Sequence, residues 1–145
     1  DIGNGTINIM KVNDRKVIND SCRTERLGVG RCVTNIQNAV MNKFQNIIDE
    51  SIVTNYLIGK PVTITKEYEE LMRICIDEYI REVISVFRKY DYNPDLMKLY
   101  VVGGGAVVMK RFSQLTDNVT YITDVCANAK GYEYMTKNFL RKNGV

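Results

Sequence analysis

The longest pattern along the chain is an apolar stripe with helical spacing in its middle part. Apolar side chains recur three and four residues apart at Tyr68, Leu71, Met72, Cys75, Ile76, Tyr79, Ile80, Val83, Ile84 and Phe87. This spacing places them on one face of an α-helix and predicts that this face is buried. Thr65 is a suitable N-cap residue for the helix, and Pro61 ends whatever structure precedes it.

Shorter patterns predict an alternation of strands and helices in the rest of the chain. Residues 6–12 alternate apolar and polar side chains, as a half-buried strand does, and Asn13-Asp14 is a turn signal before a returning strand at 15–21. A second helical stripe consists of Ile36, Val40, Phe44, Ile47 and Ile48. Further along we expect a strand at 99–102, a helix at about 107–115, a strand at 119–122 and a closing helix at about 127–141. The chain is therefore of the α/β class.

Two glycine clusters interrupt these patterns, and the first is the sequence Asp-Ile-Gly-Asn-Gly-Thr at residues 1–6. Glycine permits a positive φ and lets the backbone approach a ligand closely. The N–H groups of such a hairpin form a small anion-binding concavity. Asp1 beside this concavity is suited to hold Mg²⁺ through water. An ordinary Asn-Gly turn is the alternative explanation of the same residues.

The second cluster is Gly103-Gly104-Gly105-Ala106, directly after the strand expected at 99–102. A helix that follows a glycine turn presents backbone amides and the positive end of its dipole to a phosphate or a nucleoside. The cluster matches neither G-x-G-x-x-G nor the P-loop pattern, because no Lys-Ser or Lys-Thr follows the glycines. Those two nucleotide-binding classes are therefore disfavoured.

Together the two clusters resemble the second phosphate motif and the adenosine motif of the actin-like ATPase superfamily, which includes actins, heat-shock chaperone ATPases and sugar kinases. Two further motifs resemble the plasmid-partition actins of the ParM/StbA-like branch. They are Leu-Gly-Val-Gly at 27–30, which opens a helix, and Ala-Asn-Ala-Lys-Gly-Tyr at 127–132. Asn8 departs from the pattern, since many members carry Asp there.

The resemblance implies a ribonuclease-H-like (actin-like ATPase) fold. Its mixed five-stranded sheet has three antiparallel and then two parallel strands, with helices on both sides. The first strand is central, and only its last residues would be present here. The superfamily's first phosphate motif and catalytic carboxylate lie upstream of the second phosphate motif. We therefore expect residues 1–145 to be the C-terminal half, or domain II, of a longer protein, with a small helical insertion around residues 50–66.

The resemblance also implies roles for individual residues. Asp1 would contribute to catalysis by positioning Mg²⁺ through water. The phosphates of ATP or ADP would be held by Gly3, Asn4, Gly5 and Thr6. The nucleoside would lie against Gly103, Gly104, Gly105 and Ala106. The nucleotide would also be lined by Gly28 and Gly30, although a plain loop before a helix explains these two glycines as well.

The function implied by the resemblance is that of a bacterial filament-forming ATPase of plasmid partition in the cytoplasm. Such a protein would bind further copies of itself, its own N-terminal half and a DNA-binding adaptor protein, without touching nucleic acid or membrane directly. ATPase activity would require the upstream half, so we expect the fragment alone to be inactive. Two other classes stay open: a sugar- or acetate-kinase-type phosphotransferase of the same superfamily, and a non-enzymatic interaction domain whose glycines serve only as turns.

Composition narrows the classes of function further. The chain has 145 residues, of which 45% are hydrophobic and 26% charged, as in one ordinary domain with a core. Its formal charge of +3 is too small to indicate nucleic-acid binding. The sequence has no histidine, which rules out histidine acid–base chemistry and histidine metal ligands within it. No apolar run reaches the roughly 18 residues that a membrane span needs.

Overall fold

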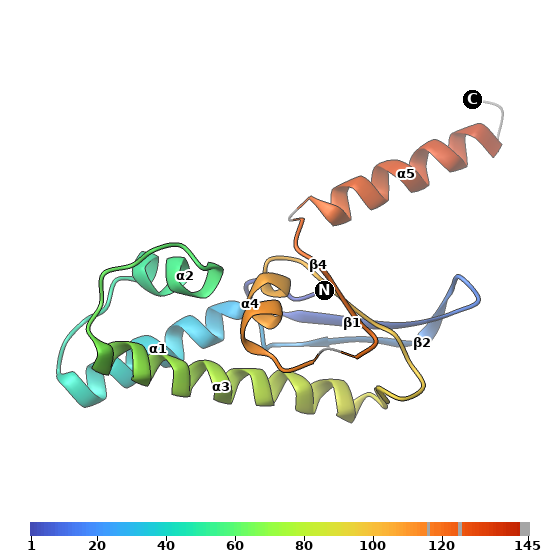
Figure 1. The fold of residues 1–145 in the computed structure, drawn as a ribbon. Coiled ribbons are helices and arrows are strands. Elements are labelled where there is room, and N and C mark those ends of the chain that lie inside the picture. The colour runs from blue at the N-terminus through green and yellow to red at the C-terminus, as the bar shows by residue number, and fades with distance from the viewer. Residues whose placement is uncertain (116, 125, 143–145) are drawn as a thin grey trace.

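The computed structural model describes residues 1–115, 117–124 and 126–142. The elements in chain order are β1 (Ile7–Asn13), β2 (Lys16–Glu25), α1 (Val29–Phe44), α2 (Glu50–Ile58), α3 (Lys66–Lys89), β3 (Leu99–Val102), α4 (Gly105–Phe112), β4 (Val119–Ile122) and α5 (Ala127–Lys142). In Figure 1, α1 and α3 lie side by side below the strands, and α5 extends away from the other elements. The expected α/β class is confirmed.

The strands form two small sheets, and the prediction of one five-stranded sheet is wrong. β1 pairs with β2 antiparallel, and β3 pairs with β4 parallel. Only residues 1–3 lie between the two sheets, and so short a segment does not make a regular strand. It nevertheless bonds to both sheets. The Ile2 N–H donates to the Val102 carbonyl oxygen at 2.9 Å, and the Asn8 N–H donates to the Asp1 carbonyl oxygen at 2.8 Å.

One face of these sheets is buried and the other is exposed. Ile7 and Val101 are 1% and 2% exposed, whereas the neighbouring Asn8 and Tyr100 are exposed to solvent. The buried strand residues share one core with residues of α1, α3 and α4. Among the described residues α5 adds nothing to this core, so the expectation of helices on both sides of the sheet is wrong for them.

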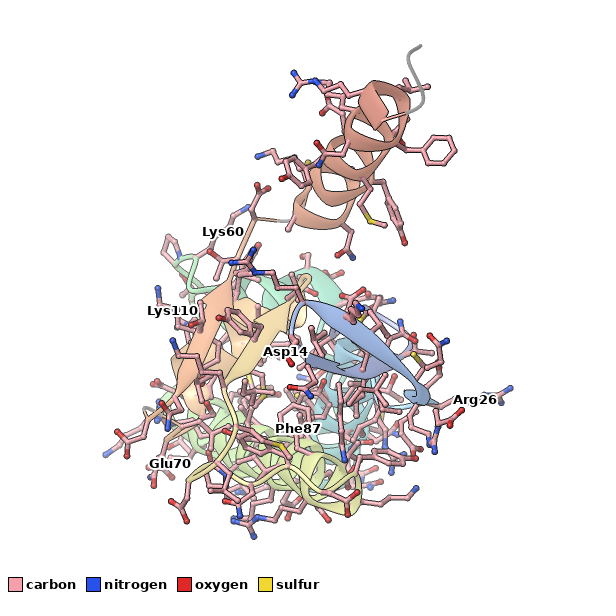
Figure 2. All side chains as sticks on the ribbon, turned by 90° about the vertical axis from the view of Figure 1, so that its right-hand side faces the viewer. Asp14, Arg26, Lys60, Glu70, Phe87 and Lys110 are labelled. Atoms are coloured by element: carbon pink, nitrogen blue, oxygen red, sulfur yellow. The ribbon has the colours of Figure 1, made fainter. Side chains whose placement is uncertain are left out.

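The core confirms the longest predicted helix. Along α3 the buried residues are Met72, Cys75, Ile76, Tyr79, Ile80, Val83 and Phe87, all on the predicted stripe. Figure 2 shows Phe87 among the interior side chains, with Arg26 and Lys60 at the periphery. Thr65 is the N-cap residue, although its side chain makes no capping hydrogen bond.

The helix α1 ends earlier than its apolar spacing suggested. Gln45, directly after Phe44, adopts a left-handed conformation with φ of 53° and ends the helix. Ile47 and Ile48 therefore lie in the following loop rather than on the helix. Ile48 is still buried, but Ile47 is 79% exposed.

A two-residue turn joins β1 to β2. Asn13 pairs with Lys16, and Asp14 and Arg15 between them have φ of 46° and 62°. Positive φ at both central residues is typical of the type I′ turn, whose twist matches that of the flanking strands. The turn signal at Asn13-Asp14 is thus confirmed, and it sets the register of the hairpin.

Candidate functional site

The glycine hairpin, residues 3–6, is closed by its own backbone and held by the start of α1. The Gly3 N–H donates to the Thr6 carbonyl oxygen at 2.9 Å. The N–H groups of residues 28, 29 and 30 donate to the carbonyl oxygens of Gly5, Gly3 and Asn4 at 3.3, 3.0 and 2.8 Å. The first amides of α1 are therefore used inside the protein, where they satisfy the carbonyl groups of the hairpin.

Three N–H groups of this hairpin have no protein acceptor. Within the described ranges, the amides of Asn4, Gly5 and Thr6 donate to no other group. Asn4 and Gly5 are exposed, and a Cβ added to Gly5 would meet no atom within 4 Å. Successive unengaged amides beside open space form a site for an anion, phosphate included.

The glycines at the start of α1 allow the helix to lie against the hairpin. A Cβ on Gly28 would lie 2.2 Å from the Asn4 carbonyl oxygen, and one on Gly30 would lie 3.0 Å from the same atom. The position of this helix start is also fixed from α3. The buried Tyr79 hydroxyl donates to the Leu27 carbonyl oxygen at 3.2 Å, and burial raises the pKa of Tyr79, so the hydroxyl remains a donor.

The second glycine cluster packs against residues 1 and 2. Gly103 has φ of 87°, and a Cβ there would lie 2.4 Å from Oδ1 of Asp1. The Gly105 N–H donates to the Ile2 carbonyl oxygen at 2.9 Å, and a Cβ on Gly105 would lie 2.2 Å from Cγ2 of Ile2. Gly104 differs, because a Cβ there would meet no atom within 4 Å. Gly103 and Gly105 thus serve close packing, and Gly104 leaves backbone open to the surroundings.

Asp1 has a hydrogen-bond partner that the sequence analysis missed. Nδ2 of Asn128, in the first turn of α5, donates to Oδ2 of Asp1 at 2.9 Å. Asp124 fixes the start of α5 nearby, since it accepts from Nζ of Lys130 at 2.5 Å and from the Cys126 N–H at 2.9 Å. These hydrogen bonds, that of Lys130 first, lower the pKa of Asp124. In the sequence, Asn128 was indicated only as part of the motif at residues 127–132.

The structure therefore places the start of α1 and the second glycine cluster against the first five residues. Gly28 and Gly30 lie against Asn4, and the Gly103 turn lies against Asp1. Ala106 is placed differently, because it is fully buried in the core. A magnesium ion that arrives with a nucleotide needs only one or two protein carboxylates beside the phosphates. Asp1 supplies one at this hairpin, so the residues present fit such an ion.

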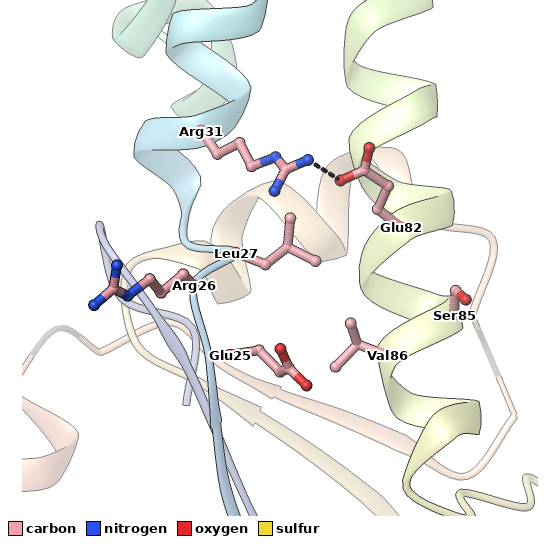
Figure 3. Close-up of a pocket in the computed structure, with 7 residues that line it drawn as sticks. All are labelled: Glu25, Arg26, Leu27, Arg31, Glu82, Ser85 and Val86. Atoms are coloured by element: carbon pink, nitrogen blue, oxygen red, sulfur yellow. Dashed lines mark ion pairs between the residues drawn. The ribbon is translucent and has the colours of Figure 1, made fainter.

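A separate pocket of about 290 Å³ lies between the end of β2, the start of α1 and α3. Figure 3 shows that the ion pair of Arg31 with Glu82, 3.5 Å long, spans it. It contains none of the predicted site residues. Its lining carries two acidic and two basic side chains, so it offers no excess charge to an anion. Its seven residues are Glu25, Arg26, Leu27, Arg31, Glu82, Ser85 and Val86.

Comparisons with known proteins identify the family and the fold. Residues 1–114 match the family model of the C-terminal domain of the archaeal MreB-like actin homologues. No curated protein matches the sequence. The crystal structure of Ta0583, an archaeal actin homologue, superposes with a TM-score of 0.75 at 19% identity, over 95% of this chain and 46% of that one.

Two further similar structures are described as complexes with a nucleotide. The complex of Ta0583 with ADP superposes with a TM-score of 0.69 at 16% identity, over 95% of this chain and 48% of that one. The structure of ParM of Bacillus thuringiensis with ATP superposes with a TM-score of 0.65 at 14% identity, over 98% of this chain and 46% of that one. At such identities the likeness shows the fold alone. The chain spans about half the length of these solved relatives.

Proposed function

The chain belongs to the family of archaeal MreB-like actin homologues, whose C-terminal domain model it matches over residues 1–114, and on this premise we propose that it is the nucleotide-binding C-terminal half of a filament-forming ATPase. The observation that carries the proposal is the set of three unengaged amides at residues 4–6, in the hairpin that follows Asp1 in the chain. An archaeal relative with ADP and a ParM with ATP support the choice of an adenine nucleotide.

In this proposal the chain's own residues bind and orient the phosphates. The amides of Asn4, Gly5 and Thr6 donate to phosphate oxygens, and the Thr6 hydroxyl adds a fourth donor. The Asp1 carboxylate holds water molecules of a magnesium ion, and Asn128 fixes the direction of that carboxylate. The nucleoside lies over Gly104, where no side chain intervenes. Magnesium supplies neutralisation of the phosphate charge, and the protein supplies positioning.

The second wall of the site comes, in our proposal, from the N-terminal half of the same protein. The chain covers only 46–48% of the solved relatives, so a domain of similar size has no counterpart in it. That half would supply the other phosphate-binding loop and the residue that activates water. Hydrolysis therefore requires both halves, whereas part of the affinity for nucleotide resides in the amides described above.

The cellular role is a narrower part of the proposal. An MreB-like family match favours a filament of general cytoskeletal type, and plasmid partition with a DNA-binding adaptor protein stays a more specific hypothesis. In the part of the chain that the structure describes, no helix has the length and apolar character needed to cross a bilayer. We propose a location in the cytoplasm.

Nucleotide binding by the complete natural protein tests the proposal. We expect fluorescent ATP and ADP analogues to bind, and Gly5→Val to weaken binding at least about tenfold, because the new side chain enters the space beside the free amides. The melting temperature without nucleotide should stay unchanged, since a Cβ on Gly5 meets no atom within 4 Å. Gly131→Val in α5 is the matched control, because that glycine is equally unhindered. Equal affinities of all three proteins would contradict the proposal.

A further inference from the structure

Each free amide of the glycine hairpin shares a peptide group with a carbonyl that the start of α1 holds. The Gly3 carbonyl and the Asn4 N–H belong to one peptide group. The same is true of Asn4 with Gly5 and of Gly5 with Thr6. These three carbonyl oxygens accept from the amides of residues 29, 30 and 28, at 3.0, 2.8 and 3.3 Å. Each peptide group is thus bonded to α1 through its oxygen, while its N–H is left for a ligand.

The planarity of the peptide group links the position of α1 to the direction of the free amides. A trans peptide group is flat, and its C=O and N–H point in opposite directions. The described residues contain no cis peptide bond. A hydrogen bond to the carbonyl oxygen therefore also fixes the direction of the N–H, and it polarises the group so that the N–H becomes a stronger donor. A displacement of the start of α1 would turn all three free amides.

The start of α1 is itself held by a buried side chain of α3. The Leu27 carbonyl oxygen, directly before the helix, accepts from the Tyr79 hydroxyl at 3.2 Å. In the described part of the chain no backbone N–H donates to this oxygen, so Tyr79 supplies its donor. Leu27 and Tyr79 are only 6% and 1% exposed. Figure 3 shows Leu27 between the end of β2 and the start of α1, facing α3. One buried hydroxyl thus fixes the backbone from which α1 begins.

Other contacts between α1 and α3 do not fix this backbone segment in the same way. Arg31 and Glu82 form an ion pair at 3.5 Å, but their side chains are 53% and 44% exposed. Such a pair contributes little, because water and salt screen the charges. The apolar contacts of the two helices are stabilising but not directional. The hydrogen bond from Tyr79 is therefore the contact that orients the start of α1.

We propose that Tyr79 is a positioning residue for the phosphate site. Its hydroxyl holds the Leu27 carbonyl, and the three amides that follow hold the hairpin carbonyls. The free N–H groups of the same peptide groups are thereby directed at the phosphates, although Tyr79 itself touches no ligand. This inference rests on the proposed function, since it concerns the amides that are assigned there to phosphate oxygens.

Two variants of the complete protein test the proposal, and each removes one hydrogen bond of this chain of contacts. Tyr79→Phe deletes the hydroxyl and keeps the ring in the core. Val29→Pro deletes the N–H that donates to Gly3, at the first position of α1, where proline is well tolerated. The preceding Gly28 is already extended, as a residue before proline should be.

We expect both variants to bind ATP and inorganic tripolyphosphate about fivefold more weakly than the unmodified protein, because less well-directed amides make poorer hydrogen bonds. Adenosine should bind equally well to all three proteins, since the nucleoside lies over Gly104. Tyr121→Phe is the matched control. Its hydroxyl also donates to a backbone carbonyl, that of Leu115 at 3.0 Å, but it lies in β4. This control should bind every ligand as the unmodified protein does.

Three binding results would overturn the proposal. The first is unchanged ATP affinity in Tyr79→Phe or Val29→Pro. The second is an equal loss of affinity for ATP and for adenosine, which would indicate a general loosening of the domain. The third is the same loss in Tyr121→Phe, which would show that any buried hydroxyl has this effect.

Amide NMR spectra without ligand separate the positioning from the proposed function. We expect the amide resonances of Asn4, Gly5 and Thr6 to shift in Tyr79→Phe and Val29→Pro and to stay in place in Tyr121→Phe. Unmoved resonances in either of the first two variants, in a protein that binds ATP, would overturn the positioning and leave the proposed function intact. Shifted resonances in a protein that binds neither ATP nor tripolyphosphate would support the positioning of the amides and overturn the proposed function.

Discussion

Asn128 and Asp1 are 127 positions apart in sequence and are joined by a hydrogen bond of 2.9 Å from Nδ2 to Oδ2. The same carboxylate lies against the Gly103 turn, where no Cβ would fit. One side chain at the edge of the glycine hairpin is thus oriented by two segments from the other end of the chain. Orientation of this kind matters most for a group whose task is to position water and a metal ion.

The first prediction concerns this pair in the complete protein. Asn128→Ala should lower the rate of ATP hydrolysis about tenfold, because a hydrogen bond to a charged group contributes roughly 1.5 kcal/mol. Asp1→Ala should abolish hydrolysis. Both should retain nucleotide binding, since the amides of residues 4–6 remain. Steady-state phosphate release measures the rates, with Asn138→Ala on the same helix as control. Normal hydrolysis by Asp1→Ala would show that the role given to this carboxylate is wrong.

The second prediction contrasts two neighbouring glycines. Gly104 has φ of −59° and open space around it, so Gly104→Val should leave the melting temperature without ligand unchanged and weaken nucleotide binding at least about tenfold. Gly103→Ala should instead destabilise the fold by roughly 1–3 kcal/mol, because of its positive φ and the nearby Asp1. Thermal melts with and without ATP distinguish these effects. If Gly104→Val keeps the full ATP-dependent rise in melting temperature, the cluster is only a turn.

The third prediction concerns the contact of α1 with the hairpin. Gly28→Ala would bring a methyl group to 2.2 Å from the Asn4 carbonyl oxygen, and we expect a loss of roughly 1–3 kcal/mol in stability to unfolding. Gly30→Ala should be close to neutral. Its contact at 3.0 Å is milder, and alanine is favoured over glycine inside a helix by about 1 kcal/mol. Urea denaturation measures both values, and equal losses would contradict this reading of the contact.

The fourth prediction is a dependence of stability on pH. Glu25 accepts hydrogen bonds from Lys89 Nζ at 2.6 Å and from the Tyr90 hydroxyl, and these bonds lower the pKa of Glu25 below its usual range. A carboxyl group with a lower pKa in the folded state stabilises the fold above its unfolded pKa, and this stabilisation is lost as the pH falls through the folded value. Glu25→Gln should therefore show a weaker loss of melting temperature on acidification than the unmodified protein. Identical acid profiles would contradict the prediction.

The fifth prediction concerns residues 1–145 on their own. We expect this fragment to hydrolyse ATP at least roughly 10³-fold more slowly than the complete protein, because loss of one wall of the site removes several kcal/mol of transition-state stabilisation. Single-turnover assays on both proteins at equal concentration provide the comparison. Hydrolysis by the fragment at the rate of the complete protein would show that a second half is unnecessary.

Local patterns predicted those elements whose cause is local. The α3 stripe and the turn at Asn13-Asp14 were correct, because helical periodicity and turn chemistry act over a few residues. The end of α1 was wrong because Ile47 continues the apolar spacing, whereas Gln45 turns left-handed just before it. The spacing of apolar side chains gives no information about a positive φ at a single residue.

Features that depend on distant segments could not be predicted from periodicity. The number of sheets depends on how residues 1–3 bond to Val102 and Asn8, and Asn128 acquires its role only where α5 meets Asp1. Ala106 follows the glycines in sequence and yet is buried in the core. The glycine motifs mark the candidate site in the sequence, but only the packing distinguishes Gly103 and Gly105, which allow close contact, from Gly104, which leaves space.

Ile2, buried between the two sheets, also determines when the domain can be completed during synthesis. Its backbone bonds to Val102 and Gly105, about 100 residues later in the chain. At a translation rate of about 5–20 residues per second, the β1–β2 hairpin therefore waits roughly 5–20 s for its neighbour. For that interval Ile2, which ends up 1% exposed, lacks its contacts with Val102 and Gly105. The newborn chain is thus most open to wrong pairing, or to a chaperone, at the very segment that we expect to bind phosphate once folding is complete.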